Sequence, residues 1–253
     1  MEPDPNPRIV ITLPVYKDTS FLESAIDTIQ LHTSKLTSNF EVVVAEDGSN
    51  SSSVVNRLIE KFNNITYIQH DEKLGRGRAL REAWSKVNAD IYAYLDVDMA
   101  GDLEQLNAYS NLIKMQNDHD LITGSRYMPE SITNRPLIRQ LASIGYNWVV
   151  RLMFRTGVHD HQCGFKSFSR ELVQTLSREA KSDTWFWDTE VIVIAKRLGY
   201  RIKEIPIYWT EKKGRKTPLK RLTRDMWLHG KGLILLFFRI QIRGELISKS
   251  LQA

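Results

Sequence analysis

The sequence has very little cysteine and no long hydrophobic run. Its single thiol, Cys163, excludes an internal disulfide, so a reducing compartment suits the chain although the sequence does not require one. Residues 1–7 are rich in proline and lack the apolar stretch of a secretory signal. The longest strongly apolar run near the end, residues 233–238, is far shorter than the roughly 18 residues that indicate a membrane span. We therefore expect a protein that is soluble or bound to a surface, not one integral to a membrane.

The composition is that of a folded domain with one strongly basic segment. Apolar residues make up 42% of the 253 residues, which allows a substantial core and argues against global disorder. This length fits one large α/β domain, or one domain with a short appendage. The formal net charge is +5, but residues 212–224 contain seven cations and no acid, so the remainder carries −2. This local charge indicates one anionic partner surface and argues against a general affinity for nucleic acid.

The first half of the chain alternates between short β-branched runs and segments with helical spacing of apolar residues. The pattern predicts strands at residues 8–13, 41–45, 65–68, 91–95 and 120–123, and helices at residues 21–31, 54–62, 78–87 and 103–115. Strands and helices that alternate at this spacing form βαβ units, so we expect a mostly parallel sheet. The less regular second half predicts a helix within residues 136–153, a polar loop at 158–168, a helix at 191–198 and an edge strand at 200–209, around Pro206.

Polar or acidic clusters directly follow three of the predicted strands, at residues 16–18, 46–47 and 96–98. Ligands of parallel sheets bind outside the carboxyl ends of the strands, so we group the three clusters into one site. Asp96 and Asp98 flank Val97 and supply the oxygen ligands that Mg²⁺ or Mn²⁺ prefers. Such an ion would neutralise a departing diphosphate. The alternative, two solvated carboxylates in a turn, is disfavoured by the apolar strand before them.

Four other segments have both a structural and a functional interpretation. Residues 46–49 either hold a nucleoside through their carboxylates or cap a turn. The glycine-rich helix start at 75–78 is a weak candidate for phosphate binding, because it lacks the full spacing of known phosphate loops. Residues 159–163 contain two histidines, an aspartate and a cysteine at no standard zinc spacing, which favours a loop with incidental ligands. The aromatic residues 185–187 form either core or, with the acids beside them, the wall of a sugar pocket.

Several short motifs follow one another in a fixed order along the chain. They are Leu13–Asp18, Glu46–Ser49, Leu74–Ala79, Asp96–Asp98, Gly124–Arg126, Arg139–Asn147, Gln162–Phe168, Trp185–Glu190, Gly199–Pro206 and Trp209–Lys216. In this order they resemble the family 2 glycosyltransferases of the GT-A fold, and among these the dolichol-phosphate mannose and dolichol-phosphate glucose synthases. The resemblance runs from about residue 9 to residue 217. It implies a Rossmann-like three-layer α/β sandwich with a mostly parallel central sheet.

The resemblance implies a donor site for a nucleotide sugar at the first four motifs. Lys17 and Asp18 stand where the family has Asn and Glu, so an acid is kept with a shorter reach, and Arg76 replaces a lysine. The two aspartates of the Asp-Val-Asp motif would bind Mn²⁺ or Mg²⁺. Ala100 takes the place of a glutamine that joins the metal in mannose synthases, so water would fill that position. The implied donor ligands are Pro14, Tyr16, Asp18, Asp47, Arg76, Asp96, Val97 and Asp98.

The resemblance also implies an acceptor site, in which Arg126 and Arg139 hold the phosphate of a polyprenyl lipid beside Ser143. Without the order of the motifs, both arginines would be taken as solvated surface charges. A phosphate monoester is already anionic near neutral pH, so a strong general base is not required. Asp188 is the candidate for binding a sugar hydroxyl or assisting as a base, and the expected catalytic residues are Asp98, Asp188 and Arg126. Attack opposite the leaving diphosphate would invert the anomeric centre.

We expect residues 8–210 to form the glycosyltransferase domain, with a nucleotide-sugar half at 8–125 and an acceptor half at 126–210. The basic amphipathic segment 211–253 would lie on an anionic membrane surface at about 1 kcal/mol per cation, or pack on the domain as an ordinary helix. This arrangement predicts a protein at the cytoplasmic face of a membrane, peripheral or anchored by a segment absent from the chain.

The donor stays open between GDP-mannose and UDP-glucose. Residues 185–190 favour glucose, whereas the two-arginine motif is shared with mannose synthases. A nucleotidyltransferase that makes a nucleotide sugar is a rival, but it would have a glycine-rich opening near the first strand. A non-catalytic module could dock on anionic membranes through residues 212–224 alone. Transfer to a saccharide hydroxyl fits the two arginines and the basic tail less well.

Overall fold

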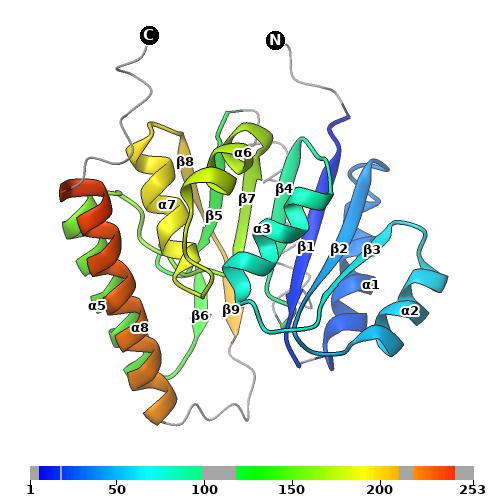
Figure 1. Ribbon diagram of the computed structural model, residues 1–253, viewed down its shortest axis with the longest axis horizontal. Coiled ribbons are helices and arrows are strands. Elements are labelled where there is room, and N and C mark those ends of the chain that lie inside the picture. The colour runs from blue at the N-terminus through cyan, green and yellow to red at the C-terminus, as the bar shows by residue number, and fades with distance from the viewer. Residues whose placement is uncertain (1–5, 18, 99–117, 211–218, 243–253) are drawn as a thin grey trace.

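A computed structural model describes residues 6–17, 19–98, 118–210 and 219–242 (Figure 1). Within these residues, seven strands form one sheet in the order β3-β2-β1-β4-β7-β5-β8. The strands are β1 (Ile9–Val15), β2 (Phe40–Asp47), β3 (Ile65–His70), β4 (Ile91–Leu95), β5 (Leu121–Ser125), β7 (Phe165–Ser169) and β8 (Ile202–Pro206). All neighbours are parallel except β7, which runs antiparallel to β4 and β5. The predicted mostly parallel sheet is confirmed.

Helices cover both faces of this sheet, as the apolar residues of β1 require. Ile9, Ile11 and Leu13 face one side, where they pack with α1 and α2, whereas Val10 faces the other side, where α3, α6 and α7 lie. The helices are α1 (Leu22–Thr33), α2 (Ser52–Lys61), α3 (Arg76–Lys86), α6 (Arg170–Glu179) and α7 (Trp187–Arg197). Strands covered on both faces account for the continuous apolar runs in the sequence. The three-layer α/β architecture expected from the resemblance is confirmed.

Most elements predicted for the first half of the chain are present. The five predicted strands and three of the four helices are confirmed, and the edge strand predicted at residues 200–209 is confirmed over residues 202–206, which form β8. The helix predicted at residues 103–115 lies outside the described residues, as do Asp18 and Ala100. Residues 208 and 209 of the predicted edge strand instead belong to β9 (Tyr208–Thr210), which pairs with β6 (Ile132–Asn134) in a separate two-stranded sheet. Strand β6 and helix α6 are additions that the sequence pattern does not predict.

The polar loop predicted at residues 158–168 is wrong over its last part, because β7 begins at Phe165 and lies inside the sheet, between β4 and β5. Phe165 and Phe168 are buried in the two opposite cores, as expected of a central strand. Between them Lys166 and Ser167 are also buried, so no continuous apolar run reveals the strand. The pattern failed because a charged side chain lies in the core, next to an acid from a distant part of the chain.

Two long helices lie side by side beyond α7 at one end of the molecule (Figure 1). They are α5 (Leu137–Phe154) and α8 (Leu219–Phe237), and a π-helical turn, Phe238–Ile242, continues α8. Leu233 and Ile240 are buried against Val150 of α5 and Val193 of α7. The described part of the predicted segment 211–253, residues 219–242, therefore packs on the domain. Of the helices that the structure describes, none combines the length and the hydropathy needed to cross a membrane.

Candidate active site

The carboxyl ends of β1, β2 and β4 lie next to one another at one edge of the sheet (Figure 1). The register pairs Val15 with Glu46 at the ends of β1 and β2, and Asp96 follows directly after β4. The polar clusters predicted at the three strand ends therefore meet at this edge, as far as they are described. The predicted donor ligand Asp18 lies outside the described residues.

The motif that follows β1 forms one wall at this edge. Pro14 lies in β1, and Tyr16 follows the strand with an exposed side chain. Nζ of Lys73 lies 3.7 Å from the centre of the Tyr16 ring, a cation–π contact. The backbone N–H of Lys17 donates to Oγ of Ser49 at 2.9 Å, which ties this motif to the one after β2. The roles of Pro14 and Tyr16 in donor binding stay predictions.

The acids at the end of β2 make hydrogen bonds within the protein. Glu46 is fully buried and accepts bonds from the N–H of Ser51 at 2.9 Å and the hydroxyl of Tyr67 at 2.8 Å. Oδ1 of Asp47 accepts bonds from the N–H groups of residues 74 and 75 at 2.5 and 2.9 Å. Asp47 therefore anchors the loop before α3, which is the structural interpretation of this motif. Its contact with a nucleoside stays a prediction.

The start of α3 presents a side chain, rather than its backbone, to the site. The N–H groups of residues 74 and 75 bind Asp47, and those of Gly77 and Arg78 donate to the carbonyl oxygen of Asp183 at 2.9 and 3.4 Å. These bonds occupy the N–H groups of residues 74, 75, 77 and 78, which argues against a phosphate cradle made by this backbone. The remaining candidate for phosphate binding in this motif is the side chain of Arg76.

Arg76 contacts acids from two distant motifs. Its side chain is only 5% exposed, and its Cζ lies 4.8 Å from the ring centre of Tyr94 and 4.4 Å from that of Trp185. Nη1 lies 3.0 Å from Oδ1 of Asp96, and Nη2 lies 3.5 Å from Oδ2 of Asp188. Burial alone would lower the pKa of Arg76, but Asp188 and Asp96 raise it above its usual value. The structure thus brings together three predicted site residues, the cation Arg76 and the two acids Asp96 and Asp188.

Asp96 is held by the backbone as well as by Arg76. Its N–H donates to the carbonyl oxygen of Gly164 at 2.9 Å, and its side chain is 18% exposed. Burial raises the pKa of Asp96 to about 6, Arg76 opposes this shift, and the charges of Asp98 and Asp188 add to it. A carboxylate whose charge is disfavoured in this way gains stability from an added cation. This environment suits a metal ligand.

Asp188 lies in the first turn of α7, next to Arg76, and is only 3% exposed. Its Oδ1 accepts the hydroxyl of Tyr94 and lies 3.4 Å from Nζ of Lys166, which is fully buried and donates to the carbonyl oxygen of Cys163 at 2.6 Å. Burial, followed by the charge of Asp188, raises the pKa of Tyr94 well above its usual value, so the hydroxyl remains a donor.

Sequence reasoning assigned no role to Tyr94 or Lys166, which pair across β4 and β7. Lys166 belongs to the motif Gln162–Phe168 of the family resemblance, whereas the only signal of Tyr94 is a polar residue inside a predicted strand.

A second charged cluster surrounds Arg126. This residue is 7% exposed and forms a two-bond pair with Asp160, in which Nε lies 2.6 Å from Oδ2 and Nη2 lies 2.8 Å from Oδ1. Its backbone N–H also donates to Oδ2 at 3.0 Å. Although burial opposes the shift, Arg126 holds the pKa of Asp160 below its usual value. The sequence indicates only an incidental loop residue here, whereas the structure makes Asp160 the fixed counter-ion of Arg126.

Two further arginines influence this cluster. Arg135, which the sequence does not single out, donates Nη1 to Oγ of Ser143 at 3.0 Å. Burial, together with the charges of Arg126 and Arg139, lowers the pKa of Arg135 to about 10. The structure therefore brings the three predicted acceptor residues together and adds Arg135. Three guanidinium groups near one carboxylate leave an excess of positive charge, which favours an anionic ligand.

The histidine in the middle of residues 159–163 has a structural environment. His161 is fully buried, with Nδ1 2.8 Å from Oδ1 of Asn147 and Nε2 2.9 Å from Oγ1 of Thr156. In the part of the chain that the structure describes, no three His, Cys, Asp or Glu side chains gather as ligands for a metal. The interpretation of this segment as a structural loop is favoured over a zinc site.

We expect the burial of His161 to make the fold sensitive to acid. Burial lowers the pKa of His161 to about 3, whereas an unfolded histidine titrates near 6.5. The neutral ring contributes its full stability above about pH 6.5, and this contribution is lost as the pH falls toward 3. Between pH 7 and pH 5 this residue should lower the free energy of unfolding by about 2 kcal/mol. Urea unfolding of the wild type and His161→Gln measures the difference, and parallel pH profiles would contradict it.

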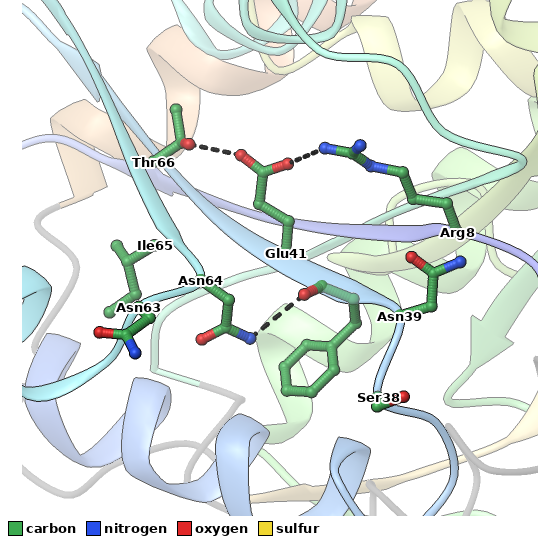
Figure 2. A pocket seen from close by; sticks show the side chains of 9 residues that line it. Arg8, Ser38, Asn39, Glu41, Asn63, Asn64, Ile65 and Thr66 are labelled. Atoms are coloured by element: carbon green, nitrogen blue, oxygen red, sulfur yellow. Dashed lines mark hydrogen bonds and ion pairs between the residues drawn. The ribbon is translucent and has the colours of Figure 1, made fainter.

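A separate recess of about 290 Å³ lies at the opposite edge of the sheet, where β1, β2 and β3 begin (Figure 2). Glu41 accepts bonds there from Arg8 at 2.8 Å and from Thr66, and Nδ2 of Asn64 donates to the carbonyl oxygen of Phe40 at 3.2 Å. None of the predicted site residues lines this recess. We therefore assign the candidate site to the carboxyl edge of the sheet.

Comparison with known families agrees with this assignment. The sequence model of Glycosyl transferase family 2 matches residues 10–177, more than half of the chain. The chain belongs to this family.

The glycosyltransferase AglD of Haloferax volcanii is 35% identical over 240 residues, which cover 93% of this chain and 38% of AglD. The dolichyl-phosphate beta-glucosyltransferase ALG5A of Trichomonas vaginalis is 30% identical over 190 residues, which cover 73% of this chain and 58% of ALG5A. The chain thus spans less than two thirds of either relative.

Solved structures of low sequence identity share the fold. Glucosyl-3-phosphoglycerate synthase from Mycobacterium tuberculosis, in complex with Mn²⁺, UDP and phosphoglyceric acid, has a TM-score of 0.69 at 17% identity, covering 91% of this chain and 78% of that one. The mannosyltransferase PcManGT from Pyrobaculum calidifontis, in complex with GDP-Man and Mn²⁺, has a TM-score of 0.61 at 19% identity, covering 94% and 65%. The GT-A fold implied by the resemblance is confirmed.

Proposed function

We propose that the protein transfers a hexose from a nucleotide sugar to a polyprenyl phosphate, with UDP-glucose as donor and dolichyl phosphate as acceptor. One observation carries the proposal: a carboxylate cluster and an arginine cluster meet along one short segment. Asp160 binds Arg126, and four residues later Gly164 contacts Asp96. A donor diphosphate with its metal suits the carboxylates, and an anionic acceptor suits the arginines.

The relatives favour glucose over mannose as the transferred sugar. Several of them are dolichyl-phosphate beta-glucosyltransferases, among them ALG5A and a human protein that is 27% identical over 252 residues. The sequence pattern at residues 185–190 points the same way. Transfer of mannose from GDP-mannose stays the alternative, because the arginine cluster binds a phosphate whichever sugar is transferred.

The donor half of the site fits a divalent cation. Asp96 and Asp98 follow β4 and supply hard oxygen ligands, and the burial that raises the pKa of Asp96 makes an added positive charge favourable. Two structures of similar fold contain Mn²⁺. Bound at these residues, Mn²⁺ or Mg²⁺ would supply the charge that stabilises the departing diphosphate. Tyr16 and Asp47 would then hold the nucleoside at the neighbouring strand ends.

The acceptor half fits a phosphate monoester. Arg126, Arg139 and Ser143 are the proposed phosphate ligands, and Arg135 joins them through its bond to Ser143. Because Asp160 fixes the guanidinium of Arg126 with two bonds, that side chain loses little entropy when a phosphate binds. The cluster would therefore orient the acceptor oxygen toward the sugar.

The acceptor supplies its own nucleophile, because a phosphate monoester has its second pKa near 6 and is largely dianionic at neutral pH. Asp188 is 3% exposed and already accepts a bond from Tyr94, so it fits the positioning of Arg76 better than a general base. Attack on the face opposite the diphosphate would invert the anomeric centre. The protein's contribution is then positioning and charge stabilisation.

We also propose that α5 and α8 dock on the anionic lipids at the cytoplasmic face of a membrane. The inner side of α5 buries the polar residues Ser143 and Asn147, whereas its outer side is apolar and exposed. The exposed apolar side chains include Leu137, Ile138, Leu141, Ile144, Trp148 and Leu152 on α5, and Trp227, Ile234, Leu235 and Phe238 on α8 and the turn after it. Helix α5 contains two arginines and no acid, which suits anionic lipid.

Adding acids to the outer side of α5 should weaken membrane binding. Ile138 and Leu141 are exposed, so replacing both by Glu should leave the fold intact and reduce binding to anionic vesicles by about 100-fold. Vesicle flotation measures the effect, and transfer to a short, water-soluble polyprenyl phosphate should persist. The control places two acids on α6, as Gln174→Glu with Ser177→Glu. Equal binding by both double variants would contradict this docking surface.

Gly164 leaves the room in which the Asp96 carboxylate lies. A Cβ at residue 164 would lie 1.9 Å from Oδ2 and 2.3 Å from Cγ of Asp96. We expect Gly164→Ala to displace the carboxylate and to reduce kcat/KM by about 100-fold, the usual cost of a ~1 Å misplacement. Gly145→Ala is the control, because a Cβ there meets nothing within 4 Å. Wild-type kinetics in a folded Gly164→Ala protein would contradict the role of Asp96.

The deciding experiment offers the protein UDP-glucose and GDP-mannose with a polyprenyl phosphate and Mn²⁺, and identifies the nucleoside diphosphate that is released. Release of UDP that depends on the polyprenyl phosphate is the expected result. Release of GDP would assign mannose, and release that depends on a free saccharide would assign a saccharide hydroxyl as acceptor. Pyrophosphate release from a nucleoside triphosphate would favour a nucleotidyltransferase. Membrane binding without any release would leave a non-catalytic module.

A further inference from the structure

Arg76 and Asp96 form an ion pair at the place where the proposed function requires a metal ligand. Nη1 of Arg76 lies 3.0 Å from Oδ1 of Asp96, and only 5% of the Arg76 side chain is exposed. A divalent cation on Asp96 would stand beside this guanidinium. The cation and the guanidinium would both be positive, and neighbouring like charges repel strongly in a poorly solvated site. Arg76 and a metal ion therefore compete for the same carboxylate.

The guanidinium of Arg76 is held in place but is incompletely satisfied. Tyr94 and Trp185 lie 4.8 and 4.4 Å from its Cζ, so the group is flanked by two rings. Nε and Nη2 are buried and make no hydrogen bond with the described residues, and Nη2 has only a 3.5 Å ion-pair contact with Asp188. Buried donors without hydrogen bonds are costly. The unsatisfied Nε and Nη2 groups of Arg76 therefore indicate that an anionic ligand supplies the missing hydrogen-bond acceptors.

We propose that Arg76 exchanges partners when the donor binds. It pairs with Asp96 in the ligand-free protein, and it pairs with the diphosphate of the donor when a divalent cation takes Asp96. The inference rests on the proposed function, because the diphosphate and the cation belong to the donor complex. The negative diphosphate compensates the cation and the guanidinium together. The metal and the nucleotide should therefore bind as a pair.

The charges around Arg76 predict how its removal changes the affinity for a divalent cation. The acids Asp96, Asp98 and Asp188 carry three formal negative charges, and Arg76 and Lys166 carry two positive ones. The charges of these five side chains sum to −1, and without the arginine they would sum to −2. Removing Arg76 should therefore improve the binding of a free divalent cation, although it removes a residue of the proposed donor site.

The first test measures Mn²⁺ binding by electron paramagnetic resonance, with and without UDP, in the wild type, Arg76→Gln and Asp98→Asn. Without UDP, Arg76→Gln should bind Mn²⁺ about tenfold more tightly than the wild type. It should also lose most of the gain in affinity that UDP provides. Asp98→Asn is the control and should bind Mn²⁺ more weakly in both conditions. Equal or weaker binding of Mn²⁺ by folded Arg76→Gln would overturn the exchange.

The second test leaves Arg76 in place, so it does not depend on the folding of an Arg76 variant. Trp185 flanks Arg76 and is 55% exposed, so the difference in fluorescence between the wild type and Trp185→Phe reports on this contact. At a Mn²⁺ concentration below that which the first test shows to occupy the wild-type site without UDP, the difference signal should change when Mn²⁺ and UDP are added together, and not with Mn²⁺ alone. A change with Mn²⁺ alone, or none with both, would overturn the exchange. If both tests succeed and no hexose is transferred, the proposed function fails while the exchange stands.

Discussion

Replacing Asp160 by alanine should lower the free energy of unfolding by about 3–5 kcal/mol. Asp160 is fully buried, and its partner Arg126 is nearly so. Without the carboxylate, a buried guanidinium loses its counter-ion and two charge-assisted hydrogen bonds at once. Urea unfolding of the wild type and Asp160→Ala at neutral pH measures this loss. A cost below about 1 kcal/mol would mean that the pair behaves like an exposed ion pair.

A double variant separates the stability of this pair from its function. Replacing Arg126 by Met and Asp160 by Leu removes both charges, so most of the stability lost in Asp160→Ala should return. The same protein should bind the polyprenyl phosphate poorly, with KM raised at least about tenfold, because a phosphate ligand is missing. Recovery of both stability and KM would contradict the acceptor role of Arg126.

Asp98→Asn should reduce kcat for hexose transfer by about 10²–10³-fold, since one ligand of the proposed cation loses its charge. Asp98 is partly exposed beyond the end of β4, so the free energy of unfolding should stay within about 0.5 kcal/mol of the wild-type value. Release of nucleoside diphosphate at saturating donor and Mn²⁺ measures the effect. Removal of the metal with a chelator should have a comparable effect on the wild type.

The matched control for this variant is Asp90→Asn, which changes a surface acid at the amino end of the same strand. Asp90 pairs with Arg170 at 2.9 Å, far from the carboxyl edge of the sheet. We expect its loss to leave kcat unchanged. An equal loss of activity in both variants would point to a general effect of charge. Full activity of Asp98→Asn would remove this residue from the metal site.

The location of the proposed donor site could be predicted from the sequence because the carboxyl edge of the sheet follows from local patterns. The apolar runs of β1, β2 and β4 identify parallel strands, and the acids directly after them fall at one edge of the sheet by the geometry of βαβ units. Asp96 and Asp98 were found in this way without knowledge of any contact. The ordered motifs then added Arg126 and Arg139, which a search for local patterns alone would have left on the surface.

The sequence did not disclose the residues that support those side chains. Lys166 and Tyr94 lie inside strands, where a polar residue weakens the pattern by which a strand is recognised. Arg135 belongs to none of the motifs, and the spacing of residues 159–163 indicates only that Asp160 is one of several incidental ligands. Each acquires its role from a partner in another element, so composition and spacing carry no record of it.

The sequence by itself determined the family, the layered α/β fold and the edge of the sheet at which the donor motif lies. The family follows from the ordered motifs, and the fold follows because burial on both faces of a parallel sheet requires continuous apolar runs, which short segments display. Only the tertiary structure decided which charges face one another: Arg76 with Asp96 and Asp188, and Arg126 with Asp160. The strength of these pairs depends on separations of a few ångströms and on exclusion of water, and both arise only when distant segments pack together.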